Sequence, residues 1–374
     1  MKDFVFSPEA LKVGPSPFRV LADKLAVNPN VINFTIGQPD FDVPEEIKKE
    51  FCAAVYAQKH GYGATAGVKA LREKILAAKN FGKEDLDVQI TTGVQGGFFT
   101  AFRTFVSTGE EVLIPDPYYL EYKGATDLLG LNVKFINTYP LFKLTLEMVK
   151  QAVTEKTKVL MMNAPNNPTG LMYDKEEMAK IIRYLDEKGV MVFYDTIYQE
   201  FNYTADKVPF NPFDYGNNVI VFDGFSKAYG MPGWRLGYMI ADKRIIERTT
   251  YVQSQIHSSA STIVQYAACA FDKVDLSPII ERYHNRRDLV EKELSGVYDF
   301  VPCEGGFYFF LKVPETLQMT GTQFCDYAFN KGAALLPGGA FSSFHDTHVR
   351  FSFTVNEEKL AKGLEILKAI ARGK

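Results

Sequence analysis

The sequence predicts an α/β protein with a mainly parallel sheet covered by helices, followed by a smaller α+β part. The first observation is a set of short runs that are apolar on both faces, as strands buried between helix layers are. These runs occupy residues 111–115, 159–163, 190–194 and 219–222. The second observation is that helix-like stretches separate them, and the third is a change of pattern near residue 270. The 374 residues leave room for two domains.

The helix-like stretches are amphipathic. In residues 175–188, Met178, Ile181, Ile182 and Leu185 recur at helical spacing, and the opposite side is charged. A helix of this kind buries one apolar stripe and leaves its charges in water. We therefore expect it to cover one face of the sheet.

The C-terminal part alternates helices and strands differently. We expect helices at 278–294, 322–331 and 357–371, strands at 307–311 and 349–353, and a turn at Gly305-Gly306. The expected large domain covers residues 42–270. Residues 1–41 and 271–374 are expected to form the small domain.

Composition excludes several classes of protein. The net charge is −3 and the basic residues are scattered, so no nucleic-acid partner is expected. No window reaches the roughly 18 apolar residues of a membrane helix, and the first residues lack a signal-peptide pattern. The four cysteines contain no Cys-x-x-Cys pair, which favours a reducing, cytoplasmic location.

Reactive side chains follow the predicted strands. Asp195 and Tyr198 follow the run at 190–194, Lys227 follows 219–222, and Asn167 follows 159–163. Because ligands bind beyond the carboxyl ends of strands in open α/β sheets, we expect these side chains to meet there. Each also has an ordinary interpretation. Lys227 could be a surface lysine, and Asp195 could cap a helix while Tyr198 packs.

A glycine-rich segment, residues 93–97, follows another strand-like run at 88–92 and leads into a helix. The free N–H groups and dipole of a helix start bind phosphate well. A tight turn with close helix packing is an equally good interpretation of the glycines.

Taken together, these features fit pyridoxal phosphate. This cofactor requires a lysine for its aldehyde, an acid for its pyridine nitrogen and an anion site for its phosphate. A buried lysine has a lowered pKa and is a better amine nucleophile.

Longer motifs agree with this interpretation. They are Ile-Gly-Gln-Pro-Asp-Phe at 36–41, Tyr62 with Thr-Ala-Gly at 65–67, Asp-Pro-Tyr-Tyr at 116–119, Asn-Pro-Thr-Gly at 167–170, Ser-Lys at 226–227 with Gly-Trp-Arg-Leu-Gly at 233–237, and Val-Arg-Phe-Ser-Phe at 349–353. In order and spacing the chain resembles a class I/II aminotransferase of the fold-type-I pyridoxal-phosphate superfamily, in its aspartate/aromatic branch. The resemblance runs nearly end to end.

The resemblance implies roles around the cofactor ring. Lys227 would hold the cofactor and later shuttle a proton, and Asp195 would pair with the pyridinium nitrogen. Tyr198 and Asn167 would hydrogen-bond the ring oxygen, and Tyr119 would stack on the ring.

The resemblance also implies a phosphate site. Val94, Gln95, Ser226 and Arg235 would hold the phosphate, and Tyr62 would reach the phosphate of a neighbouring subunit, which implies a homodimer. One departure from relatives is Gly224, where many of them have a phosphate-binding serine.

For the substrate, the resemblance implies that Arg350 clamps the α-carboxylate, with Asn167 nearby and Gly37 closing over it. The expected activity moves the amino group of an L-amino acid, such as aspartate or an aromatic one, to a 2-oxo acid such as 2-oxoglutarate by a ping-pong mechanism. Arg19 is a candidate reader of a second carboxylate, with a surface charge as its ordinary interpretation.

Two other functions stay open. One is a pyridoxal-phosphate-dependent C–S β-lyase of the same fold, and the other is a non-catalytic ligand-sensing module. His345 and His348 lie three residues apart without an acidic third ligand, so no metal site is expected.

Overall fold

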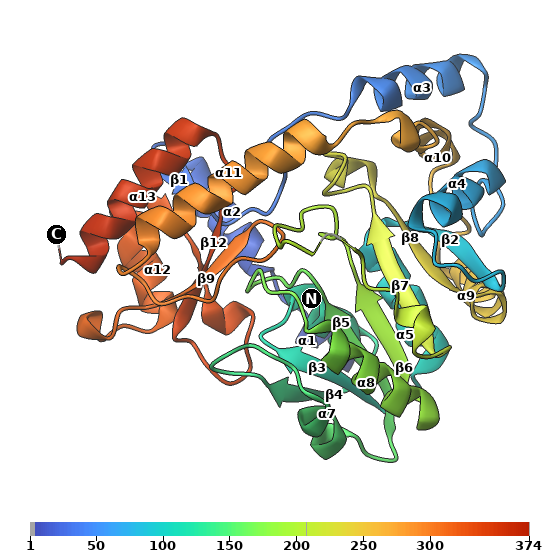
Figure 1. Ribbon diagram of the computed structural model, residues 1–374, viewed down its shortest axis with the longest axis horizontal. Helices are drawn as coiled ribbons and strands as arrows, with labels where there is room; N and C mark the ends of the chain where they lie inside the picture. Colours follow the sequence, from blue (N-terminus) through green and yellow to red (C-terminus); the bar gives the residue numbers. More distant parts are fainter. Residues whose placement is uncertain (1–3, 207, 374) are drawn as a thin grey trace.

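The computed structural model describes residues 4–206 and 208–373, and a seven-stranded sheet lies at its centre (Figure 1). The strand order is β2-β8-β7-β6-β5-β3-β4. The strands are β2 (Leu86–Thr92), β3 (Glu111–Asp116), β4 (Asn132–Asn137), β5 (Thr157–Asn163), β6 (Met191–Asp195), β7 (Val219–Gly224) and β8 (Leu236–Asp242). Only β8 runs against its neighbours. The predicted mainly parallel sheet is therefore confirmed.

Helices cover both faces of this sheet. One core cluster contains residues of α4 (Lys69–Lys79), α7 (Leu146–Ala152) and α8 (Lys175–Glu187). The other contains residues of α5 (Gly93–Phe105), α6 (Leu120–Leu128) and α9 (Lys243–Ile256). Strand residues alternate between the two clusters, and for this reason the strands are apolar on both sides.

A smaller three-stranded antiparallel sheet forms in the C-terminal part, in the order β11 (Leu336–Pro337), β12 (His348–Ser352) and β9 (Tyr308–Lys312). Nearby, β1 (Ile32–Asn33) pairs with β10 (Ala333–Ala334), so the N-terminal segment joins this part of the chain. The remaining helices are α1 (Pro8–Lys12), α2 (Pro17–Ala26), α3 (Glu45–Tyr56), α10 (Thr262–Ala268), α11 (Ser277–Leu294), α12 (Gly321–Asn330) and α13 (Glu357–Ala371).

The structure decides between the alternative interpretations of two local features. Helix α5 already begins at Gly93, so the glycine-rich segment is the first turns of the helix. A Cβ on Gly97 would lie 3.3 Å from the Met239 and Phe222 side chains, so this glycine lets the helix approach the sheet closely. Asp195 ends a strand and caps no helix; its carboxylate accepts from the Ile197 N–H in a turn.

In the part of the chain that the structure describes, no helix is long and apolar enough to cross a membrane.

The close contact between α5 and β8 yields a prediction about stability. A Cβ on Gly237 would lie 2.6 Å from the backbone nitrogen of Val94, and backbone cannot move aside as a side chain can. We expect Gly237→Ala to lower the free energy of unfolding by about 1–3 kcal/mol, measured by denaturant titration. Gly14→Ala is the control, because a Cβ there meets no atom within 4 Å. Equal effects of both substitutions would contradict the prediction.

Candidate active site

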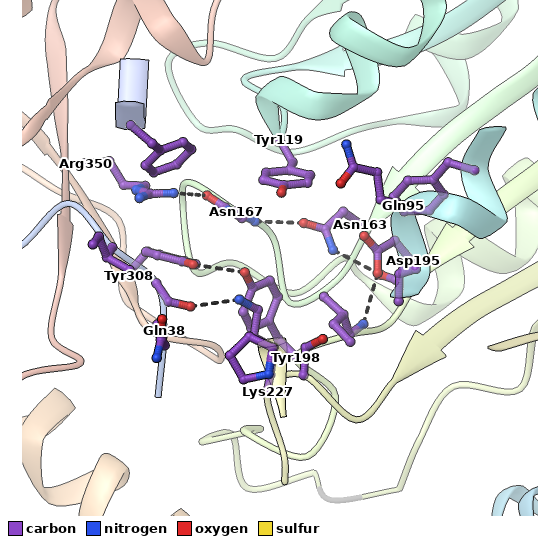
Figure 2. Close-up of a pocket in the computed structure, with 18 of the residues that line it drawn as sticks. Gln38, Gln95, Tyr119, Asn163, Asn167, Asp195, Tyr198, Lys227, Tyr308 and Arg350 are labelled. Carbon is purple, nitrogen blue, oxygen red and sulfur yellow. Dashed lines mark hydrogen bonds between the residues drawn. The ribbon is translucent and has the colours of Figure 1, made fainter. Parts of the chain in front are cut away.

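The strand ends surround one cavity of about 420 Å³ (Figure 2). Of the predicted site residues, those that line it are Gly37, Val94, Gln95, Tyr119, Asn167, Asp195, Tyr198, Ser226, Lys227, Arg235 and Arg350. Tyr62 does not line the cavity. It lies fully exposed on the surface, at 101% of its reference area.

Lys227 follows β7 and its amine points into the cavity. Its Nζ donates a hydrogen bond to the backbone carbonyl of Gly37 at 2.8 Å. Burial, together with the positive charges of Arg350 and Arg235, lowers the pKa of Lys227 to about 8. The amine is therefore deprotonated far more readily than that of a surface lysine, as attack on an aldehyde requires.

Asp195 ends β6 and is 3% exposed. Its carboxylate accepts from the Tyr122 hydroxyl at 2.6 Å and from the Ile197 N–H at 3.0 Å. Burial raises the pKa of Asp195 to about 7, although these hydrogen bonds lower it. Among the described residues no cation forms an ion pair with this carboxylate. A protonated pyridine nitrogen would supply the missing positive partner.

Arg350 lies on β12 and is 1% exposed. One nitrogen donates to Asn167 Oδ1 at 3.0 Å and another to the Thr35 carbonyl, and the Tyr308 ring lies 4.4 Å from the guanidinium. Its Nε has no hydrogen-bond partner, and no carboxylate pairs with it within residues 4–206 and 208–373. A buried guanidinium without an anion is costly unless a ligand carboxylate completes it.

A chain of hydrogen bonds joins Arg350 to Asp195 across the cavity floor (Figure 2). Arg350 donates to Asn167, whose backbone N–H donates to Asn163 Oδ1 at 2.8 Å, and Asn163 donates to the Asp195 carbonyl at 3.1 Å. Arg350 and Asp195 are thus linked through Asn163, which ends β5, and Asn167, which lies in the loop after it.

The start of α5 and Arg235 form the anion side of the cavity. Gly93 has a φ of 66°, and a Cβ there would lie 2.6 Å from Arg235 Nη2. Gly224 packs against β8, and a Cβ there would meet the Gly237 Cα at 2.9 Å. The helix dipole, the Arg235 charge and nearby Ser226 suit a phosphate.

Two tyrosines of this site were not predicted from the sequence. Tyr122 donates to Asp195, and the hydroxyl of Tyr308 lies 2.9 Å from that of Tyr198. Tyr122 lies on α6, three residues after Tyr119, which caps the start of that helix, and this spacing could have indicated its role. Tyr308 lies in an aromatic run that is typical of a core strand.

The charges of the cavity fit the expected cofactor and substrate together. A buried acid lacks a cation, a buried arginine lacks an anion, and Arg235, whose guanidinium lies beside the start of α5, has no acidic partner among the described residues. Pyridoxal phosphate presents a pyridinium and a phosphate, and an amino acid presents a carboxylate. These groups match the unpaired charges one for one.

Comparison with known proteins decides the family. A model of the family described as "Aminotransferase class I and II" matches residues 29–367. The chain belongs to this family. It is 30% identical to a probable aspartate aminotransferase of Methanocaldococcus jannaschii, covering 98% of this chain and 100% of that protein. It is also 30% identical to aromatic-amino-acid aminotransferase 2 of Thermococcus litoralis, with 97% of each covered.

Solved structures agree. Aspartate aminotransferase of Thermotoga maritima has a TM-score of 0.91 and 28% identity, covering 98% of this chain and 100% of that one. This protein is therefore a pyridoxal-phosphate-dependent aminotransferase of the fold-type-I class, which acts on amino acids and 2-oxo acids. The comparisons favour neither the lyase nor the ligand-sensing module.

The environment of Lys227 predicts how cofactor attachment depends on pH. Only the unprotonated amine attacks an aldehyde, so the attachment rate of the cofactor-free aminotransferase should rise with pH and level off above about 8. Stopped-flow absorbance measures this rate. In Arg350→Met the midpoint should move upward, because one positive charge near the amine is gone. A midpoint near the ordinary lysine value of 10.5, or one unmoved by Arg350→Met, would contradict this description.

Proposed function

We propose that this aminotransferase takes the amino group from an L-amino acid with an uncharged, aromatic side chain and passes it to a 2-oxo acid. One observation carries the proposal. The cations that line the cavity are Lys227, Arg235 and Arg350, and each already has a partner in the cofactor or in the substrate α-carboxylate. Among the described residues none is left for a second substrate carboxylate.

The proposed chemistry uses few side chains. When bound, pyridoxal phosphate supplies the aldehyde that takes up the amino group and a ring that withdraws electrons from the α-carbon. Asp195 would keep the pyridine nitrogen of the cofactor protonated and therefore positively charged. Lys227, with a pKa near 8, would take a proton from the substrate α-carbon as a base and then deliver it, as an acid, to the carbon of the former cofactor aldehyde. The Gly37 carbonyl holds its amine.

The ring and phosphate would be held by neutral and basic groups. Asn167 accepts from Arg350 with its oxygen, so its amide nitrogen is left to donate to the ring oxygen. Burial raises the pKa of Tyr198, which keeps its hydroxyl as a second donor. Tyr119 offers a stacking face. Val94, Gln95, Ser226 and Arg235 would bind the phosphate.

Arg350 would hold the α-carboxylate. A guanidinium has five N–H donors, and two are used by Asn167 and Thr35. The three that remain suffice for a two-pronged contact with a carboxylate.

The surroundings of the substrate side chain support an uncharged donor. Phe18 and Ile36 line the cavity, and their apolar surface suits an uncharged side chain. Arg19, the other candidate, has a side chain that is 75% exposed and faces Asp23.

We also propose a domain division, a homodimer and a cellular location for this aminotransferase. Residues 42–270 would form the large domain and residues 1–41 with 271–374 the small one, supported by the pairing of β1 with β10. A homodimer would bring the exposed Tyr62 to the phosphate of the neighbouring site. The four free cysteines support a cytoplasmic location.

Single-turnover measurements test the substrate proposal without any choice of acceptor. The loaded aminotransferase is mixed with one amino donor, and the absorbance change of the cofactor is followed. We expect kcat/KM for phenylalanine and tyrosine to exceed that for aspartate by about 10-fold or more, the effect of one unpaired buried charge. Lys227→Ala should show no reaction with any donor. Faster reaction with aspartate than with phenylalanine would refute the substrate class, and an active Lys227→Ala protein would refute the mechanism.

A further inference from the structure

An N-terminal strap, defined as residues 35–40, crosses the active site and touches two of its charged groups. The Thr35 carbonyl accepts from Arg350 Nη2, and the Gly37 carbonyl accepts from Lys227 Nζ at 2.8 Å. A Cβ on Gly37 would overlap the Tyr308 hydroxyl, at 1.6 Å. The strap therefore has almost no freedom to shift without disturbing both charged groups.

The beginning of the strap is tied to β12 and the residues that follow it. Ser352 N–H donates to the Phe34 carbonyl at 2.9 Å, and the hydroxyls of Ser352 and Thr354 donate to the Ile36 carbonyl at 3.2 and 2.7 Å. Arg350 lies on this same strand. The upstream end of the strap and the substrate-binding arginine thus share one support.

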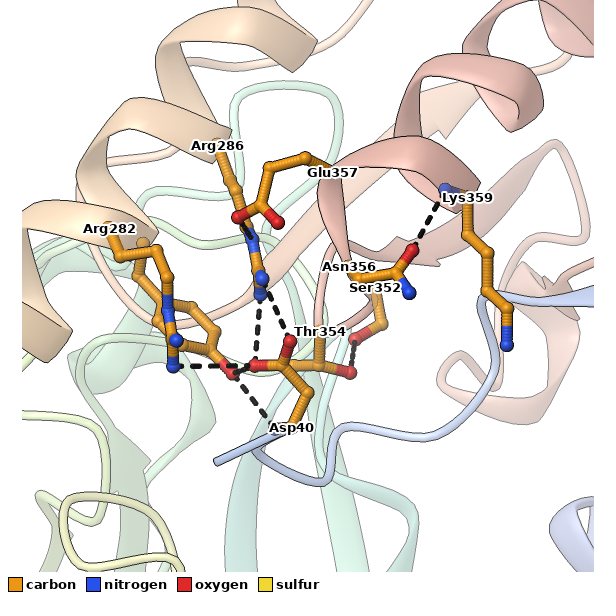
Figure 3. A network of polar contacts seen from close by, with 9 residues as sticks. Asp40, Arg282, Arg286, Ser352, Thr354, Asn356, Glu357 and Lys359 are labelled. Atoms are coloured by element: carbon orange, nitrogen blue, oxygen red, sulfur yellow. Dashed lines mark hydrogen bonds and ion pairs between the residues drawn. The ribbon is translucent and has the colours of Figure 1, made fainter. Parts of the chain in front are cut away.

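The other end of the strap is tied by Asp40 to helix α11 (Figure 3). The two carboxylate oxygens accept from Arg286 at 3.0 and 2.8 Å, and one also accepts from the Tyr283 hydroxyl at 2.8 Å. The Asp40 N–H donates back to the Tyr283 oxygen at 3.2 Å. Burial works against the charge of Asp40, but the bonds from Arg286 and Tyr283 lower its pKa overall.

Arg286 makes this a strong anchor. Its side chain is 3% exposed, and its Nε donates to Glu357 on α13 at 2.9 Å. Arg282, one turn earlier on α11, lies 3.8 Å from Asp40. A buried, two-pronged pair fixes geometry in a way that exposed pairs do not, and loss of either partner leaves a buried charge unpaired.

We propose that Asp40 is a positioning residue for transamination: through Arg286 it holds the strap so that the Thr35 and Gly37 carbonyls keep Arg350 and the Lys227 amine in register with the substrate. The inference rests on the proposed function. It assigns to the Asp40–Arg286 pair an effect on substrate binding, separate from its effect on the stability of the helices.

Asp40→Asn tests this role. The substitution keeps the size of the side chain and removes the charge. We expect kcat/KM for the amino donor to fall by about 10- to 100-fold, mainly through a higher KM, because small misplacement of binding groups is enough for such losses. Arg286→Lys, which keeps the charge but cannot form two parallel bonds, should give an intermediate loss. Absorbance of the bound cofactor should remain in both variants.

Lys368→Met is the matched control. Lys368 pairs with Glu293, so this pair also joins α13 to α11, but neither residue touches the strap. It should lower the unfolding midpoint while leaving KM unchanged. A KM in Asp40→Asn that equals the wild-type value, or a KM in Lys368→Met that rises as much, would overturn the proposal.

Two further measurements keep the result decisive. If Asp40→Asn does not fold, Thr354→Val takes its place, because it removes the hydrogen bond to the Ile36 carbonyl at the other end of the strap. This substitution should also raise KM. An unchanged KM in Thr354→Val would overturn the proposal. Failure of the proposed function would be distinct, because the wild-type aminotransferase would then bind the cofactor without transaminating aromatic donors.

Discussion

Two buried charges without ionic partners govern the structure of this active site. Asp195 is a nearly inaccessible carboxylate without a cation, and Arg350 is a nearly inaccessible guanidinium without an anion. Such groups reduce the stability of a protein unless hydrogen bonds and a ligand compensate them. Here the Tyr122 hydroxyl and the Ile197 N–H donate to Asp195, while Asn167 and the Thr35 carbonyl accept from Arg350, and these bonds compensate the two charges in part. We propose that the cofactor and the substrate complete the compensation. The cavity is in this sense arranged for charges that arrive with its ligands.

The fold explains how these charges meet. A parallel sheet brings the carboxyl ends of β5, β6 and β7 to one edge, which places Asn163, Asp195 and Lys227 together although many residues separate them in the sequence. Helix α5 supplies its N-terminus to the same edge. Arg350 lies on β12 of the C-terminal sheet. The N-terminal strap contacts both Arg350 and Lys227, so it connects the C-terminal sheet with the end of β7. Each part of the chain therefore contributes a charge or a hydrogen bond that the others lack.

Much of this arrangement could be predicted from the sequence. Apolar runs marked β3, β5, β6 and β7, and the residues after them gave Asp195 and Lys227, because strand ends are local features. Tyr122 and Tyr308 were not predicted, since their roles depend on which side chain packs opposite them. The same is true of the bond between Asp40 and Arg286, which are 246 residues apart. The glycine-rich segment predicted the start of a helix, but glycines in a helix resemble a turn until the close approach of β8 is known.

Thermal unfolding of Asp195→Asn, with and without pyridoxal phosphate, tests the central claim most directly. The folded-state pKa of Asp195 is about 7, above its unfolded value of 3.8, so its charge opposes folding fully above pH 7 and has no effect below 3.8. Above pH 7 the cofactor-free variant should therefore unfold at a higher temperature than the cofactor-free wild type. With cofactor the order should reverse, because only the wild type pairs with the pyridinium. A variant that is less stable than the wild type in both states would contradict this account.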